Sequence, residues 1–285
     1  MTALGFTLLL VAAFSHAIWN VFVKRINGGP ELVWLFSTIA IVIYAPVAAY
    51  IWVTAKPVFG AQEILFILGS IALHLAYFLL LQRGYRKGDL SLVYTTARAS
   101  GPFLSTMFAV VFLGEKITLQ IAAGGLAIIV GVVFLTGGFN ASARNMGASL
   151  LFGLGAGLFI GSYTVWDAYA VSMVLVPPLL LDYASSLGRA VLLAPLAARR
   201  WALVQSHWRE HRLGVVAIAI FSPLAYILVL YALTFTPVVY VAPMREQSVL
   251  ITVLLGSIML GEGDLVRRLR WSIFILIGVV MLATG

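Results

Sequence analysis

The stretches VVFLGEKIT (residues 110–118) and SIMLGEGDL (residues 257–265) share a Leu-Gly-Glu core and lie 147 residues apart. The same offset aligns further residues along the chain without a gap. The aligned pairs are Ser15 with Ser162, Trp19 with Trp166, Asn20 with Asp167, Arg98 with Arg245, and Gly131-Val132-Val133 with Gly278-Val279-Val280. A single offset that links so many positions indicates an internal duplication. We therefore predict two related halves, residues 1–138 and residues 148–285.

The composition places both halves in a lipid bilayer. Of the 285 residues, 62% are hydrophobic and 10% are charged, against about 45–50% and roughly 25% in a soluble domain. The mean hydropathy is +1.06. A spanning helix needs about 20 apolar residues, so ten helices use roughly 200 and leave about 85 for short loops and tails. We predict an all-α integral membrane protein with ten spans, at 4–23, 32–53, 62–82, 90–113, 118–137, 148–170, 176–197, 213–233, 237–260 and 269–284.

Five spans in each half is an odd number, so the two halves must cross the membrane in opposite directions. Such inverted repeats are an established architecture of secondary transporters. The loop charges agree, because thirteen of the fifteen Lys and Arg residues outside the spans follow odd-numbered spans. Only Lys56 and Lys116 follow even-numbered ones. By the positive-inside rule, this bias places both termini outside the cytoplasm.

Several classes of protein are excluded by what the sequence lacks. The chain has no cysteine, so it forms no disulfide, zinc–thiolate site or iron–sulfur cluster. It contains no HExxH, GxSxG or P-loop motif, so we expect no catalytic residues, metal or cofactor. The net charge of +8 is spread over short loops, which indicates membrane orientation rather than nucleic-acid binding. The N-terminus has no basic region before the first apolar stretch, so we expect that span to be retained.

Arg98 and Arg245 are the first candidates for a substrate site. They occupy the same repeat position in spans 4 and 9, and each has a proline nearby, Pro102 and Pro243. An ionisable residue within a span is costly in lipid and usually faces a polar cavity. Proline disturbs the helix, and irregular backbone in a membrane is tolerated where it lines such a cavity. Arg can bind a carboxylate or phosphonate through two hydrogen bonds. The alternative is a structural ion pair that holds helices together.

Other polar and aromatic residues could complete this site. Those in spans 1, 3, 4 and 6 are His16, Trp19, His74, Tyr77, Tyr94 and Trp166. Glu246 and Asp182 are candidates for carrying a coupling proton, and Asp182 shares a helix face with Arg189. Helix packing is the alternative role for each. Asn20 and Asp167 lie near the ends of their spans, where an interfacial or capping role is equally plausible.

The duplicated motifs resemble those of the EamA family of the drug/metabolite transporter superfamily. Leu113-Gly114-Glu115 with Gly131-Val132-Val133, repeated once in the second half, carries the resemblance. His16-Ala17-Ile18-Trp19-Asn20 with Lys24, and the stretch from Gly88 to Tyr94 before Arg98, are similar to a subgroup associated with phosphonate utilisation. The resemblance implies a bacterial inner-membrane exporter of amino acids or related metabolites. Its central cavity would be lined by helices 1, 3, 4, 6, 8 and 9.

The resemblance also implies cytoplasmic termini, which conflicts with the charge bias, and we follow the charges. Three deep arginines against two deep acids favour an anionic or zwitterionic substrate. We therefore expect a secondary active transporter, an exporter that works by alternating access and functions as a monomer, with or without proton coupling. The alternatives are a passive channel or facilitator and a membrane-embedded lipid-handling enzyme.

Overall fold

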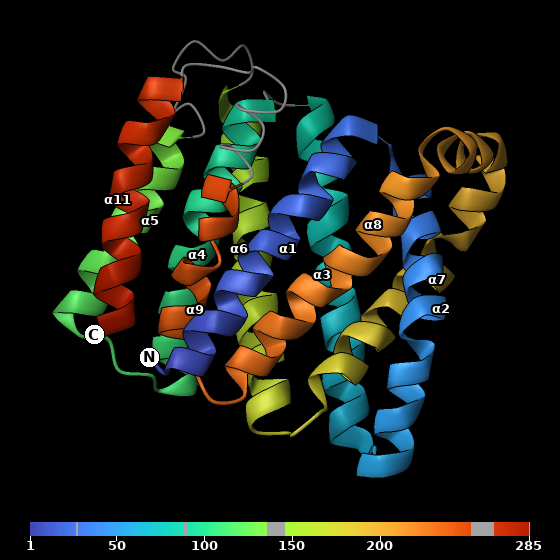
Figure 1. Cartoon of the computed structure of the whole chain (residues 1–285), viewed down its shortest axis with the longest axis horizontal. Coiled ribbons are helices and arrows are strands. Elements are labelled where there is room, and N and C mark those ends of the chain that lie inside the picture. Colours follow the sequence, from blue (N-terminus) through green and yellow to red (C-terminus); the bar gives the residue numbers. More distant parts are fainter. Residues whose placement is uncertain (27, 88–89, 136–145, 252–264, 285) are drawn as a thin grey trace.

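The computed structural model describes the chain except residues 27, 88–89, 136–145, 252–264 and 285. All regular structure in the described part is helical (Figure 1). The helices are α1 (Ala3–Ile26), α2 (Pro30–Ala55), α3 (Ala61–Lys87), α4 (Leu90–Leu113), α5 (Leu119–Leu135), α6 (Met146–Ser172), α7 (Pro178–Arg199), α8 (Trp201–Leu233), α9 (Val238–Met244) and α11 (Leu265–Thr284).

The helices match the hydropathy of a multi-pass membrane protein. Within the described residues, seven helices are long and apolar enough to cross a bilayer: α1, α2, α3, α4, α6, α7 and α8. The helices α5 and α11 are apolar but shorter. Helix α9 ends at Met244, a turn occupies Arg245 and Glu246, and helix resumes over 247–251. The predicted ninth span is therefore broken at the arginine rather than continuous.

The packing of α5 against α11 shows that the halves are inverted. These helices correspond to each other under the 147-residue offset, and their glycines lie in contact. A Cβ atom at Gly124 would lie 3.0 Å from the carbonyl oxygen of Gly278, and one at Gly131 would lie 2.6 Å from the side chain of Ile275. Residues with higher numbers on α5 therefore contact residues with lower numbers on α11. The corresponding helices run antiparallel.

Other helix pairs follow the same symmetry. Helix α1 packs on α8, and the corresponding pair, α6 and α3, also packs together. Helices α2 and α7, which correspond to each other, are in contact as well. In Figure 1, α1 begins at the lower edge of the molecule, whereas α6 ends there. The described structure therefore confirms the predicted inverted, duplicated helical fold.

Glycines on α6 allow it to lie close against α4. A Cβ atom added at Gly153, Gly157 or Gly161 would come within 3.0 Å of a side chain of α4. Small residues at this spacing let membrane helices approach closely. The contact runs along α4 from Thr96 to Phe108 and along α6 from Gly153 to Gly161.

Helix α8 starts earlier than the predicted eighth span. Its first ten residues precede a kink at His211, whose backbone (φ −131°, ψ 26°) is not helical. Trp201, Leu203 and Trp208 are exposed, and arginines flank them. This combination is typical of a helix at the membrane interface, which keeps its hydrogen bonds internal without being a full span. Hydropathy alone assigned the segment to a loop because of its charge.

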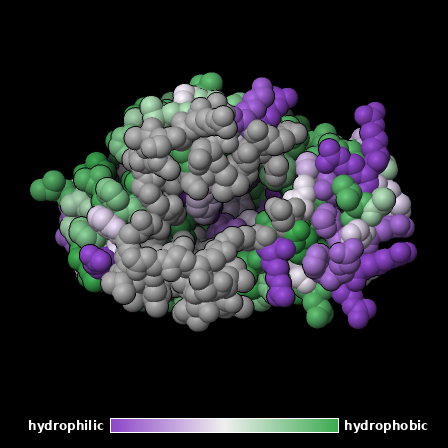
Figure 2. Space-filling model, turned by 90° about the horizontal axis from the view of Figure 1, so that it is seen from above, coloured by the Kyte–Doolittle hydropathy of each residue, from purple (hydrophilic) through white to green (hydrophobic). Residues whose placement is uncertain are grey.

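Hydrophilic side chains gather on the face opposite the two termini. Figure 1 places both termini at the lower edge, and Figure 2 views the molecule from above. Hydrophilic residues are concentrated in that view on the side where α7 ends and α8 begins. Arg199, Arg209 and Arg212 are exposed residues of this region.

Candidate functional site

The central polar site lies where α1, α4 and the break after α9 meet. Arg98 donates from Nη1 to Oε1 of Glu246 at 3.3 Å. Its Nη2 atom lies 3.1 Å from Nε2 of His16. The guanidinium also lies over the ring of Tyr94, 5.5 Å from its centroid. The structure thus brings together four predicted residues, Arg98, Glu246, His16 and Tyr94.

His16 is held between two N–H donors. In addition to the contact with Arg98, Nδ1 of His16 accepts a hydrogen bond from the indole Nε1–H of Trp19 at 3.2 Å. A neutral imidazole has only one unprotonated nitrogen that can accept a hydrogen bond. Both contacts therefore cannot be good hydrogen bonds at once. The arginine retains donor capacity that an anionic ligand could use.

Arg245 lies on the other side of the same region without a carboxylate partner among the described residues. Its guanidinium lies over the ring of Tyr226, 5.4 Å from the centroid. Its Nη1 atom lies 3.5 Å from the hydroxyl of Thr164, which is a long hydrogen bond. The two arginines therefore share an environment, because each lies against a tyrosine face. Among the described residues, only Arg98 forms an ion pair with an acid.

The broken ninth span explains how Arg245 and Glu246 both face this region. Pro243 has no backbone N–H, and the helix ends one residue later. The turn allows neighbouring side chains to leave the helix spacing of about 100° per residue. The predicted disturbance beside Arg245 is confirmed. Pro102, by contrast, lies inside the continuous helix α4.

A second polar group lies beside Arg245 and centres on Asp167. Oδ2 of Asp167 lies 2.9 Å from Nε2 of His74, and it also accepts the hydroxyl of Tyr226. His74 stacks on Tyr163, with ring centroids 4.1 Å apart, and Tyr77 contacts Tyr163 edge-on. The site predicted at His74 and Tyr77 is thus a cluster around a buried acid.

Asp167 is 0% exposed, and its side chain bonds to residues of α3 and α8. Helix α6 continues to Ser172, which places this acid farther from the helix end than the sequence suggested. Its burial also corrects the charge count, because three deep acids now face three deep arginines. The excess of positive charge is local, because Glu246 forms an ion pair with Arg98 and not with Arg245.

Trp166 takes part in the packing of α6 on α3. Its Nε1–H donates to the carbonyl oxygen of Phe66 at 2.8 Å, and its ring packs on that phenylalanine. Gly69 leaves room for the indole, since a Cβ there would lie 2.4 Å from it. The structure therefore places Trp166 against α3, with its single polar atom already bonded.

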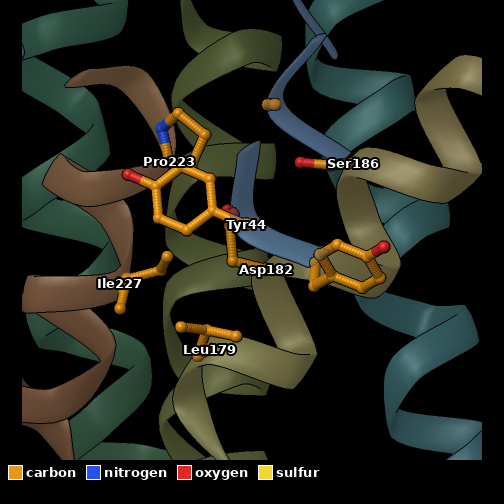
Figure 3. Close-up of a pocket in the computed structure, with 8 residues that line it drawn as sticks. Tyr44, Leu179, Asp182, Ser186, Pro223 and Ile227 are labelled. Atoms are coloured by element: carbon orange, nitrogen blue, oxygen red, sulfur yellow. The ribbon is translucent and has the colours of Figure 1, made fainter. Parts of the chain in front are cut away.

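Asp182 and Arg189 lie apart from this centre, on α7. Arg189 donates to the hydroxyl of Ser186 at 2.9 Å. Asp182 lines a pocket between α2, α7 and α8 together with Tyr44, whose hydroxyl donates to the carbonyl oxygen of Ile220 (Figure 3). Leu179, Pro223 and Ile227 make the rest of the labelled wall largely apolar.

Glu115, in the first Leu-Gly-Glu motif, caps the start of α9. Its two carboxylate oxygens accept the backbone N–H groups of Val238 and Val239 at 2.7 and 2.8 Å. These groups have no partner within the helix, so the carboxylate satisfies them. The motif's role was not deduced from the sequence, since the partner lies 123 residues away. The corresponding Glu262 lies outside the described residues.

The site offers hydrogen-bond donors and acids. No group of three or more His, Cys, Asp and Glu side chains in the described chain could hold a metal ion. Six helices or their ends contribute to the central residues: α1, α3, α4, α6, α8 and α9. These are the helices expected to line the cavity.

Comparison with known proteins agrees with this architecture. The model of the EamA-like transporter family matches the chain twice, over residues 3–137 and 147–284. No curated protein matches the sequence. A solved structure described only as "Crystal structure of protein" is similar in fold, with a TM-score of 0.76 and 17% identity. That match covers 100% of this chain and 98% of the other. The chain therefore belongs to the EamA-like transporter family, a non-enzymatic family of the drug/metabolite transporter superfamily.

Proposed function

We propose that this transporter is a secondary active exporter of a small anionic or zwitterionic metabolite. Arg98 and Arg245 would bind the carboxylate or phosphonate of the substrate between the two halves. The observation that supports this most is that two symmetry-related, partly buried arginines have one ion-paired carboxylate between them, Glu246, among the described residues. An anionic substrate would supply the missing charge.

The energetic argument points the same way. An arginine near the centre of a membrane helix costs about 2.5–3.5 kcal/mol on insertion scales. A structural role would favour pairing each arginine with its own acid, yet Arg245 has only a tyrosine face and a distant hydroxyl. A substrate that engages both guanidiniums would stabilise the conformation in which the two halves close around it.

Alternating access fits an inverted duplication. The same helices are arranged in opposite directions in the two halves, so rocking one half against the other can expose the site to either side in turn. We propose that the protein works as a monomer in a bacterial inner membrane with both termini in the periplasm. The concentration of exposed arginines opposite the termini supports this orientation.

Ligand-induced stabilisation tests the substrate site. Purified protein would be heated in detergent with glutamate, methylphosphonate or ethanolamine, and its melting temperature recorded. A ligand at 100 times its Kd adds about 2.7 kcal/mol to the stability of the state it binds. We expect stabilisation by at least one of the two anionic compounds and none by ethanolamine, which carries only a positive charge.

Lysine variants distinguish binding of the anion by the guanidinium from the effect of a positive charge alone. Arg98→Lys and Arg245→Lys keep the charge but lose the planar fork of the guanidinium, so each should reduce the stabilisation by the anion. Arg209→Lys, at the exposed charged face, is the control and should keep it. Full stabilisation in both buried variants would count against direct binding. In proteoliposomes, movement of the substrate down its own gradient without any solute moving in exchange would indicate a channel instead.

A further inference from the structure

The junction of α7 and α8 carries a short helical segment on the surface of the molecule. Before the kink at His211, the first turns of α8 lie across the upper edge of the bundle, between the end of α7 and the long descending part of α8 (Figure 1). Trp201 and Trp208 are exposed on these turns. Residues 199–212 contain four arginines and one acid, so this surface segment is strongly basic.

Contacts with the bundle fix how the surface segment lies. Glu31, which is buried near the start of α2, accepts a hydrogen bond from Nη1 of Arg200 at 3.1 Å. Its other carboxylate oxygen lies 3.8 Å from Nε2 of His207. Val204 is buried in an apolar cluster with residues of α1 and α2. One side of the segment is therefore held against the protein, and its other sides face the surroundings.

Aromatic and basic side chains share the outward side. At about 100° per residue, Trp201, Trp208 and Arg209 fall within about 100° of one another around the helix. Arg199 and Arg212, near the two ends of the segment, are exposed like Arg209. None of these three arginines forms an ion pair with a residue that the structure describes. Their positive charges are thus available to a partner.

This combination fits the headgroup of an anionic phospholipid. Tryptophan rings are enriched at the level of the headgroups, and a guanidinium binds a phosphate through two parallel hydrogen bonds. Each arginine near an anionic membrane surface strengthens binding about fivefold. The one acid of the segment, Glu210, accepts the hydroxyl of Ser206 at 2.6 Å and does not offset the arginines by an ion pair. Exposed tryptophans beside the arginines favour a lipid over an acidic protein as the partner.

The internal duplication shows that this surface is not part of the repeated framework. Under the 147-residue offset, none of the positions that correspond to the three outward arginines is basic: they are Trp52, Gln62 and Leu65. The first half connects α2 to α3 through residues 56–60 alone. Orientation by positive charge explains on which side of the membrane the arginines lie, but it does not require exposed tryptophans beside them.

We propose that the outward surface of the 199–212 segment binds anionic phospholipids in the leaflet opposite the two termini. The indole rings of Trp201 and Trp208 lie among the headgroups, while the outward arginines bind the phosphates. The lipid is a partner of the protein surface rather than a transported molecule. The inference therefore stands apart from the proposed anionic substrate and from the residues that would bind it.

Fluorescence quenching by brominated lipids tests this lipid site. The full-length protein is placed in nanodiscs of equal parts phosphatidylglycerol and phosphatidylcholine, with bromine on the acyl chains of either one lipid or the other. The difference between the wild type and Trp208→Phe isolates the emission of Trp208. We expect brominated phosphatidylglycerol to quench this emission more than brominated phosphatidylcholine does. The preference should vanish at about 1 M salt, where the Debye length falls to about 3 Å.

A pair of double variants shows whether the arginines produce the preference. Arg209→Gln/Arg212→Gln, measured with and without Trp208, should lower it about fivefold for each arginine removed. Lys56→Gln/Lys116→Gln removes the same charge from exposed residues elsewhere and should keep it. Equal quenching by the two lipids in the wild type, or a preference that survives in the arginine variant, would overturn the inference.

The absence of quenching by either lipid would also overturn the inference, because it would place Trp208 outside the bilayer and leave the surface to an acidic protein. The measurement involves neither substrate nor flux. Its failure would leave the anionic substrate to be decided by the thermal-stabilisation test, and failure of that test would leave the lipid site unaffected.

Discussion

Replacing Gly157 by alanine should destabilise the seam between α4 and α6. The new Cβ atom would lie 2.0 Å from the hydroxyl oxygen of Ser100, 2.9 Å from its Cβ and 3.1 Å from the backbone nitrogen of Gly101. The serine hydroxyl cannot rotate away freely, because it donates to the carbonyl oxygen of Thr96 at 2.6 Å. The backbone nitrogen cannot move without shifting α4. Overpacking of this kind costs about 1–3 kcal/mol.

Gly125→Ala provides a matched control. It also lies inside a helix, α5, but a Cβ there would meet only Pro243, at 3.5 and 3.9 Å, which is ordinary contact. Both variants gain about 0.8–1.0 kcal/mol from the better helix propensity of alanine, so this contribution cancels between them. The Gly157 variant should therefore be less stable than the Gly125 variant by about 1–3 kcal/mol.

Thermal unfolding of both variants and the wild type in one detergent would measure this difference. We expect the melting temperatures to fall in the order Gly125→Ala, wild type, Gly157→Ala. Equal melting temperatures for the two variants would refute the close contact between α4 and α6.

Three further predictions follow from features described above. Burial raises the pKa of Glu115, outweighing the hydrogen bonds from α9, so its contribution to stability is greatest below the usual glutamate pKa and is lost as the pH rises through the raised value. The melting-temperature advantage of the wild type over Glu115→Gln should therefore shrink from acid to neutral pH, and a growing advantage would contradict this sign. A compartment-sensitive reporter fused after Gly285 should score as periplasmic, and a cytoplasmic score would show that the loop charges do not set the orientation. Trp166→Phe should lower stability by about 1 kcal/mol through loss of the hydrogen bond to Phe66, whereas no change on unfolding would mean that water replaces it.

Much of the helical framework could be predicted from the sequence, since long apolar runs and the 147-residue offset are properties of the chain itself. The start of α8 could not, because the segment before His211 is too charged for a span and too polar on average to stand out. Its exposed tryptophans and flanking arginines are typical of a helix that lies at the membrane interface. Hydropathy averaged over a window does not register that kind of helix.

The candidate site was predicted in part. Arg98 and Arg245 could be paired from the repeat, but the sequence does not show which acid lies beside which arginine. Glu246 adjoins Arg245 in the chain and yet pairs with Arg98, because the turn after α9 directs the two side chains differently. Asp167 was undervalued because its depth depends on where α6 ends and on its contacts with α3 and α8. Both depend on tertiary packing rather than local pattern.

The glycines of α6 have a consequence for the energetics of transport. Their counterparts under the internal offset are Phe6, Leu10 and Phe14 on α1, which are far larger. Helix α1 therefore cannot approach its neighbours as closely as α6 approaches α4. In a perfectly repeated protein, the inward-facing and outward-facing conformations would be equivalent and equally populated. Here the close contact between α4 and α6 has no equally small-residue counterpart on α1, so we expect the empty transporter to rest mainly in one of the two conformations. Substrate binding must then supply the free energy to populate the other.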